Sequence, residues 1–168
     1  MSLSSEDPVI VAAANRFGVR YLYPYQRLVI ANILDGVSGK ETCSEARGDE
    51  SPSDQDRREG PDHLRQIVLL PTGYGKSLCF QLPAVLLPGL TLAVYPLRSL
   101  MADQSRRLAE KGIPCALLQG GQDDLERRST EETIRSGKAR IVLANPEILR
   151  SGSVLNLLRS AGVAHAVI

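Results

Sequence analysis

Long apolar runs, cysteine pairs and aromatic residues are all scarce in this 168-residue sequence. No run of about eighteen apolar residues occurs, so no membrane-spanning helix is predicted. The first residues, Met1 to Pro8, have neither the basic start nor the apolar stretch of a secretory signal. The three cysteines, Cys43, Cys79 and Cys115, are widely spaced and fit neither a disulfide framework nor a zinc site. They suit free thiols in a reducing compartment, so we expect a cytoplasmic protein.

The hydrophobic share of 43% and the charged share of 23% are typical of a globular domain with a packed core. A net charge of +1 does not by itself indicate a nucleic-acid-binding protein. The charges are unevenly distributed, because residues 36–64 hold eight acidic and four basic side chains. The rest of the chain carries 16 basic and 11 acidic residues. This excess is consistent with a mildly basic domain, and ordinary surface charge is the alternative.

Three regions differ in composition. Residues 1–35 include apolar residues at helical spacing, which predicts N-terminal helices. Residues 36–64 are rich in Gly, Ser, Asp and Glu and contain no aromatic residue. Such a segment buries too little apolar surface to offset the entropy of ordering, so we expect a flexible acidic insertion. Residues 65–168 form the third region.

In that third region short apolar runs alternate with longer stretches of helical pattern. The alternation predicts an α/β fold, in which helices cover both faces of a parallel sheet. The predicted strands are residues 67–70, 91–95, 115–118, 141–144 and 164–168, and the predicted helices are residues 76–87, 97–111, 123–136 and 154–160. Ligands bind at the carboxyl ends of strands in such sheets, so functional residues are expected directly after each run.

A phosphate-binding loop directly follows the first predicted strand. It reads Pro71-Thr72-Gly73-Tyr74-Gly75-Lys76-Ser77 and is followed by an apolar helix, which is the context that a Walker A motif requires. The two glycines allow backbone angles that let the loop wrap around phosphate. Its N–H groups and the helix N-terminus would then form an anion site.

Two side chains of this loop carry the expected chemistry. Lys76 is predicted to bring its positive charge to the β- and γ-phosphates of ATP, and we assign it the catalytic role. The Ser77 hydroxyl is predicted to ligate Mg²⁺. Leu70 stands where the strict motif has Gly, which argues against nucleotide kinases and most GTPases.

Four landmarks resemble the RecQ-like DNA helicases of superfamily 2. The run from Pro71 to Ala84, which continues the phosphate loop as Ser-Leu-Cys-Phe-Gln-Leu-Pro-Ala, resembles their motif I over its whole length. Residues 96–104 resemble motif Ia, and residues 145–147 resemble motif Ib. Residues 17–18 and 24–26 resemble the adenine-reading segment that precedes motif I. The resemblance implies a RecA-like P-loop domain that binds ATP with Mg²⁺.

The resemblance also implies roles for residues outside the loop. Gln26 would read the adenine edge through its amide, although a solvated glutamine at a helix start is the alternative. Tyr23 stands where the family usually has Arg, and it would stack on the adenine. Arg98, Ser99 and Asn145 would donate hydrogen bonds to the phosphates of a DNA single strand or single/double-strand junction.

The resemblance further implies a 3'-5' helicase activity for the full-length protein. The family's next landmark, an Asp-Glu motif, would follow residues 164–168, so we expect a RecA-like domain that is incomplete at its C-terminus and does not turn over ATP alone. The resulting sheet edge would be open to a protein partner. Two alternatives are a non-catalytic module that binds ATP and nucleic acid, and a small P-loop kinase.

Overall fold

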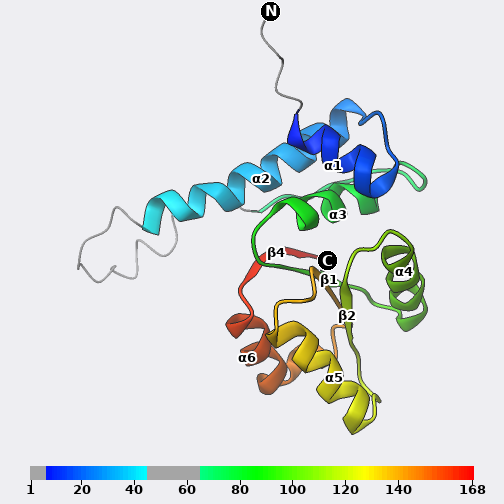
Figure 1. Ribbon diagram of the computed structural model, residues 1–168, viewed down its shortest axis with the longest axis vertical. Helices are drawn as coiled ribbons and strands as arrows, with labels where there is room; N and C mark the ends of the chain where they lie inside the picture. Colours follow the sequence, from blue (N-terminus) through cyan, green and yellow to red (C-terminus); the bar gives the residue numbers. More distant parts are fainter. Residues whose placement is uncertain (1–6, 45–64) are drawn as a thin grey trace, which may run out of the picture. The chain divides into compact units, whose positions relative to one another are not determined.

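The computed structural model describes residues 7–44 and 65–168, and within α2 it describes side chains only as far as Ser38 (Figure 1). The elements in chain order are α1 (Pro8–Phe17), α2 (Pro24–Ser44), α3 (Lys76–Leu86), β1 (Leu90–Val94), α4 (Arg98–Glu110), β2 (Cys115–Leu118), α5 (Asp124–Arg135), β3 (Ile141–Ala144), η2 (Ile148–Arg150), α6 (Gly152–Ser160) and β4 (Val163–Val167).

The chain divides into two compact units. The first consists of Met1–Tyr21 with Ala84–Ile168, and the second is Leu22–Pro83. The boundary falls inside α3, directly after Pro83. The predicted division into residues 1–35, 36–64 and 65–168 was based on composition, whereas these units are defined by packing.

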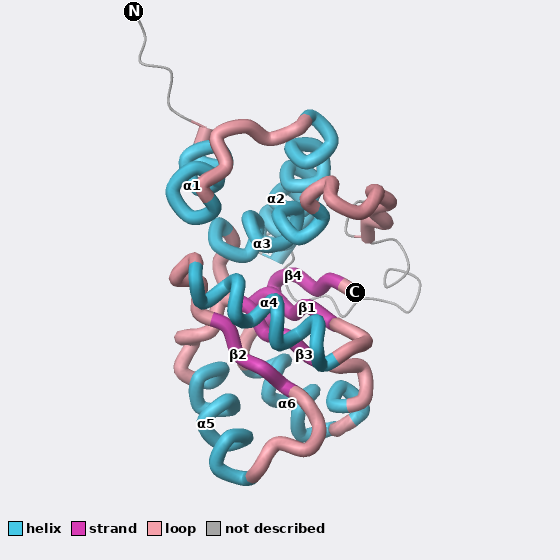
Figure 2. Tube along the Cα trace, turned by 90° about the vertical axis from the view of Figure 1, so that its right-hand side faces the viewer, coloured by secondary structure: helices cyan, strands magenta, loops and turns pink. Residues whose placement is uncertain are grey.

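The sheet of the first unit is parallel, with the strand order β2-β3-β1-β4 (Figure 2). Strand β3 lies between β1 and β2 inside the sheet and is buried along its whole length. Alternate residues point to opposite faces of a strand, so Val142 and Ala144 share one face. These two residues pack in one core cluster with Ile134 of α5 and Leu157 of α6.

The other face of the sheet is covered by α4, which contacts β2 and β3 and buries Met101 and Leu108 completely. Figures 1 and 2 show α4 on the opposite side of the sheet from α5 and α6. The predicted α/β fold with helices on both faces of a parallel sheet is therefore confirmed. Four of the five predicted strands and all four predicted helices of residues 65–168 occur within two residues of their expected ends.

Side chains at the helix ends explain where several of these helices begin and stop. The Asp7 carboxylate accepts a hydrogen bond from the Val9 N–H, and Pro8 occupies the first turn of α1. Gly18 ends α1 with a left-handed backbone, a conformation that glycine adopts without steric cost. In the same way, the Asp123 carboxylate accepts a hydrogen bond from the Glu126 N–H at the start of α5.

The strand predicted for residues 67–70 was wrong. These residues do not form a strand, and the Ile67 and Leu69 side chains are 90% and 89% exposed. A strand needs a neighbour to accept and donate its backbone hydrogen bonds. The elements described within Leu22–Pro83 are helical, so this segment has no strand partner in its own unit.

The boundary of the predicted insertion also needs correction. Helix α2 continues through residue 36 and ends at Ser44, inside the segment that was expected to lack structure. A low apolar content weakens a helix less than it weakens a packed core, because a helix satisfies its backbone hydrogen bonds internally. Residues 45–64, the remainder of the predicted insertion, lie outside the described residues.

No helix in the part of the chain that the structure describes is long and apolar enough to cross a membrane.

Candidate functional site

The phosphate loop is an exposed turn that leads into α3. The Tyr74 N–H donates to the Pro71 carbonyl at 3.4 Å, and the Leu78 N–H donates to the Gly75 carbonyl at 3.0 Å as the helix begins. Gly73 and Gly75 have φ values of 88° and 74°, which other residues rarely adopt. The wrapped backbone expected for a phosphate loop is therefore present at the N-terminus of a helix.

Lys76 is held inside its own loop. Its Nζ atom donates to the Leu70 carbonyl at 2.8 Å and to the Pro71 carbonyl at 3.0 Å. Both partners are neutral oxygens, so phosphate oxygens would bind the ammonium group more strongly. The Lys76 ammonium group therefore lies against the backbone of the phosphate loop. A phosphate bound in this loop could replace the two carbonyl oxygens as its partner.

Gln26 joins the predicted adenine-reading segment to the phosphate loop. Its side chain is only 4% exposed. The Oε1 atom accepts a hydrogen bond from the Tyr23 N–H at 3.1 Å, and Nε2 donates to the Tyr74 carbonyl at 3.3 Å. The alternative of a solvated glutamine is wrong. The predicted contact with adenine stays a prediction, since these two bonds already use part of the amide's capacity.

Gly75 lies so close to Gln26 that a side chain on residue 75 would displace the Gln26 amide. A Cβ atom on residue 75 would lie 2.5 Å from Gln26 Nε2, whereas a Cβ atom on Gly73 would meet nothing within 4 Å. The position of the Gln26 side chain therefore depends on glycine at residue 75. Gln26 also bonds the Tyr74 carbonyl, from which 48 positions separate it in the sequence.

Three tyrosines lie beside this contact. The Tyr23 and Tyr25 rings stack at 5.4 Å with an interplanar angle of 6°, and the Tyr25 and Tyr74 rings are tilted at 6.1 Å. The Tyr25 hydroxyl donates to the Tyr74 carbonyl at 3.2 Å. Loss of hydration, followed by the neighbouring Tyr23, raises the pKa of Tyr25 and keeps it a neutral donor. Tyr23 is thus stacked on Tyr25, and its stacking on adenine stays a prediction.

Ser77 lies half-buried in the first turn of α3, one residue after Lys76. Its hydroxyl is an oxygen ligand, the kind that Mg²⁺ prefers. Among the described residues there is no group of three or more His, Cys, Asp or Glu side chains that could hold a metal ion. The role of the Ser77 hydroxyl as a Mg²⁺ ligand therefore stays a prediction.

The predicted DNA contacts lie at the carboxyl ends of the strands, in the first unit. Arg98 and Ser99 are exposed at the start of α4, four and five residues after the end of β1. Asn145 directly follows β3, and its N–H donates to the Leu118 carbonyl at the end of β2. The three residues therefore belong to the same edge of the parallel sheet, as expected.

Asn145 differs from Arg98 in exposure and in its partners. It is only 4% exposed, and its Nδ2 atom donates to the Glu147 carboxylate at 3.2 Å. Its Oδ1 atom is buried and has no hydrogen-bond partner among the described residues. The Asn145 side chain is thus oriented by Glu147, and a hydrogen bond from it to DNA stays a prediction.

The DEAD/DEAH box helicase family matches residues 23–164, which include the phosphate loop, residues 24–26 of the adenine-reading segment and the strand-end residues. The chain belongs to this family. Its similarity to RecQ-like helicases is also confirmed by curated relatives. The chain is 43% identical over 97 residues to the ATP-dependent DNA helicase RecQ of Synechocystis, covering 58% of this chain and 20% of that protein.

Two further relatives of this helicase chain give the same result. It is 35% identical over 102 residues to the RecQ helicase of Pasteurella multocida, covering 61% of this chain and 16% of the relative. It is 41% identical over 93 residues to the ATP-dependent DNA helicase Q-like 5 of Arabidopsis thaliana, covering 55% of this chain and 10% of the relative. The chain therefore spans a fifth or less of these three proteins.

Two features of this helicase chain were not assigned by sequence reasoning. Tyr25 was part of the quoted motif but had no role, and only the structure shows its bond to the phosphate loop. The Arg98 guanidinium lies over Gly120 and Gly121, 3.4 to 3.8 Å from where their Cβ atoms would be. The sequence signal for this approach of Arg98 was the Gly-Gly pair shortly after the third predicted strand.

Proposed function

We propose that this chain is the ATP-binding part of a RecQ-like DNA helicase motor, with Lys76 as the residue that holds the phosphates. One observation carries the proposal. Gln26 and Tyr25 both donate to the Tyr74 carbonyl, so the adenine-reading segment and the phosphate loop form one hydrogen-bonded unit. A site that contacts the base and the phosphates of one nucleotide needs this arrangement.

ATP binding would use each of these groups differently. The Lys76 ammonium would leave the Leu70 and Pro71 carbonyls for the β- and γ-phosphates, and the α3 N-terminus would add N–H donors. Mg²⁺ would be held by the Ser77 hydroxyl, and it would neutralise charge on the phosphates. Gln26 would contact the adenine edge, and Tyr23 would extend the aromatic surface toward the base.

The proposal extends to the whole protein of which this sequence would be a part. There, ATP hydrolysis would be coupled to 3'-5' DNA unwinding in the cytoplasm. Residues 1–168 alone are expected not to turn over ATP, because positioning the phosphates without stabilising the transition state does not accelerate hydrolysis. A phosphate-release assay with single-stranded DNA tests this, with Lys76→Ala as the contamination control.

The ATP site is tested by calorimetry with ATP and Mg²⁺. Lys76→Ala is expected to weaken binding by roughly 1.5–3 kcal/mol, the size of a charge-assisted hydrogen bond. The matched control is Lys138→Ala, because Lys138 is an exposed lysine of the other unit. Equal ATP affinity in the Lys76→Ala variant and the unmodified chain would refute the assignment.

The DNA contact is tested by the salt dependence of oligothymidylate binding. Arg98→Ala is expected to weaken binding and to lower the slope against salt by about one ion, since one phosphate contact is lost. Arg128, exposed on α5, is the control position. If Arg128→Ala weakened DNA binding and Arg98→Ala did not, the assigned face of the sheet would be wrong.

A further inference from the structure

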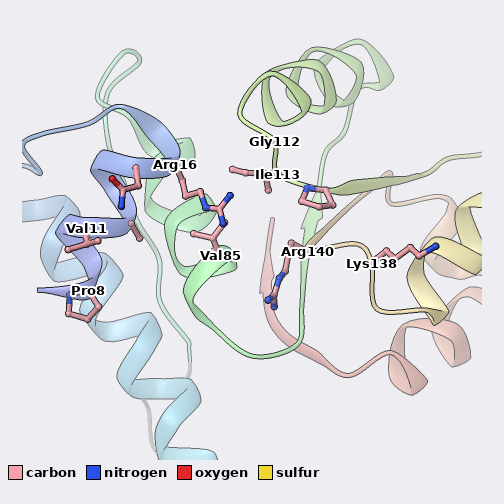
Figure 3. A pocket seen from close by; sticks show the side chains of 11 residues that line it. Pro8, Val11, Arg16, Val85, Gly112, Ile113, Lys138 and Arg140 are labelled. Atoms are coloured by element: carbon pink, nitrogen blue, oxygen red, sulfur yellow. The ribbon is translucent and has the colours of Figure 1, made fainter.

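A hollow lies within the first unit, at the ends of the strands opposite to Arg98 and Asn145. It has a volume of about 470 Å³ and is bounded by α1, the end of α3, the turn before β2 and the turn before β3 (Figure 3). Pro114 and Arg140, which line it, directly precede β2 and β3. We call it the basic pocket. It contains none of the residues assigned to ATP or DNA.

The frame of the basic pocket is fixed by contacts within the unit. The Arg140 N–H donates to the Pro114 carbonyl at 2.9 Å, and the Arg140 carbonyl accepts from the Thr91 N–H at 3.0 Å. The Lys111 ammonium lies 4.9 Å from the centre of the Phe17 ring, which links the turn before β2 to the end of α1. A ligand would therefore meet walls that are already ordered, which lowers the entropy cost of binding.

The charge of the pocket is of one sign. Arg16, Lys138 and Arg140 line it, all three are exposed, and the lining includes no acidic residue. We call them the three pocket cations. None of them forms an ion pair with an acidic side chain among residues 7–38 and 65–168. Elsewhere in the same unit, Arg106, Arg127 and other arginines are paired with carboxylates on their own helices. The pocket cations are thus available to an anionic ligand.

The remaining wall is aliphatic. Val11 and Val85 are half-buried, and Ile113 is 3% exposed. No aromatic side chain lines the pocket, so it offers no stacking surface for a nucleobase. Its volume falls in the range of about 300–1,000 Å³ that is typical of small ligands. The pocket therefore suits an anion with an aliphatic part better than it suits a nucleotide or a nucleic-acid strand.

We propose that the basic pocket binds a short acidic peptide of a partner protein. One aliphatic side chain of the peptide packs against the aliphatic wall, and carboxylates on either side of it pair with the three pocket cations. Charge pairs steer the peptide to the site, and burial of the aliphatic side chain adds affinity that salt does not screen. The proposal does not depend on the ATP site, because it needs neither nucleotide nor Lys76.

The test uses a fluorescein-labelled peptide in which Asp residues flank a single Leu, and fluorescence anisotropy with the 168-residue chain in the absence of nucleotide. Arg140→Glu is expected to weaken binding at least about tenfold, because it replaces an attraction by a repulsion. Lys138→Glu is expected to act in the same direction. Arg128→Glu, a charge reversal on α5 outside the pocket, is expected to change little.

Two further measurements separate this proposal from its competitors. Replacing the peptide's Leu by Ser is expected to weaken binding about threefold or more, since the aliphatic contact is lost. Unlabelled oligothymidylate is expected not to displace the peptide. Displacement by oligothymidylate, equal binding of the Ser peptide, or no loss in either pocket variant would overturn the proposal. If Arg140→Glu lowers the melting temperature, Lys138→Glu decides the outcome.

Discussion

Two runs of four residues in this chain have nearly the same sequence and opposite environments. Residues 67–70 read Ile-Val-Leu-Leu, and residues 141–144 read Ile-Val-Leu-Ala. The second run is β3, which pairs with β1 and β2 and has all four residues buried. The first has no strand partner among the described residues, and its Ile67 and Leu69 side chains are about 90% exposed. Strand formation here is decided by available neighbours, because intrinsic β-propensity cannot distinguish the two runs.

The comparison is tested most strongly by the same substitution in both runs. Leu143→Ala is expected to lower the free energy of unfolding by about 2–5 kcal/mol, because Leu143 is completely buried and leaves a cavity. Leu69→Ala is expected to change it by less than about 0.5 kcal/mol, since an exposed side chain leaves none. Urea unfolding followed by circular dichroism measures both. A loss at Leu69 as large as that at Leu143 would mean that residues 67–70 are packed in solution.

Gly73 and Gly75 of the phosphate loop form a second pair of matched positions. Substitutions there are expected to lower the free energy of unfolding less than Leu143→Ala does. Gly73 and Gly75 both have positive φ, so alanine strains the backbone at either site by roughly 1 kcal/mol or more. Only at Gly75 does the new Cβ atom also meet Gln26 Nε2. Gly75→Ala is therefore expected to weaken ATP binding and lower stability more than Gly73→Ala does.

The contact with Gln26 can be isolated by a double-mutant cycle. In a Gln26→Ala background the steric conflict is absent, so Gly75→Ala should cost less stability than it does in the unmodified chain. The cost of Gly73→Ala should be the same in both backgrounds. An unchanged cost of Gly75→Ala would show that backbone strain alone explains its effect.

The same contrast explains which features could be predicted from the sequence. The alternation from residue 90 onward was sufficient for β1 to β4, because each apolar run there pairs with another strand of the same sheet. The glycine turn that leads into α3 was predictable because Gly73, Gly75 and Lys76 form a local pattern, whereas its binding of phosphate stays a prediction. The bonds of Gln26 and Tyr25 to the Tyr74 carbonyl were not predictable, since they join residues 48 and 49 positions apart through a backbone atom that carries no sequence signal. The approach of Arg98 to Gly120 and Gly121 was also missed, although the Gly-Gly pair is visible in the sequence, because nothing local links that pair to residue 98.

The smallest expected effect concerns β4, the last strand in the sheet order. His165 pairs in register with Thr91 of β1, and its Nδ1 atom is buried without a hydrogen-bond partner among the described residues. Burial lowers the pKa of His165 below its ordinary value of 6.5, because the charged imidazolium loses hydration. The folded chain therefore resists protonation, whereas the unfolded chain takes up the proton at about pH 6.5.

The sign of the pH effect follows from this difference. As the pH falls below about 6.5, the unfolded state binds the proton first, so the stability that is present at higher pH is lost. His165→Gln removes the titration and keeps a polar side chain, so the variant should lose about 1–2 °C less in melting temperature than the unmodified chain between pH 7.5 and 5.5. Equal losses in both proteins would place His165 in water rather than in the sheet. In contrast to Leu143, whose burial is expected to stabilise the sheet strongly, His165 would then contribute nothing that depends on burial, and β4 would be held by its backbone bonds to β1 and by the packing of Val163 against the core cluster.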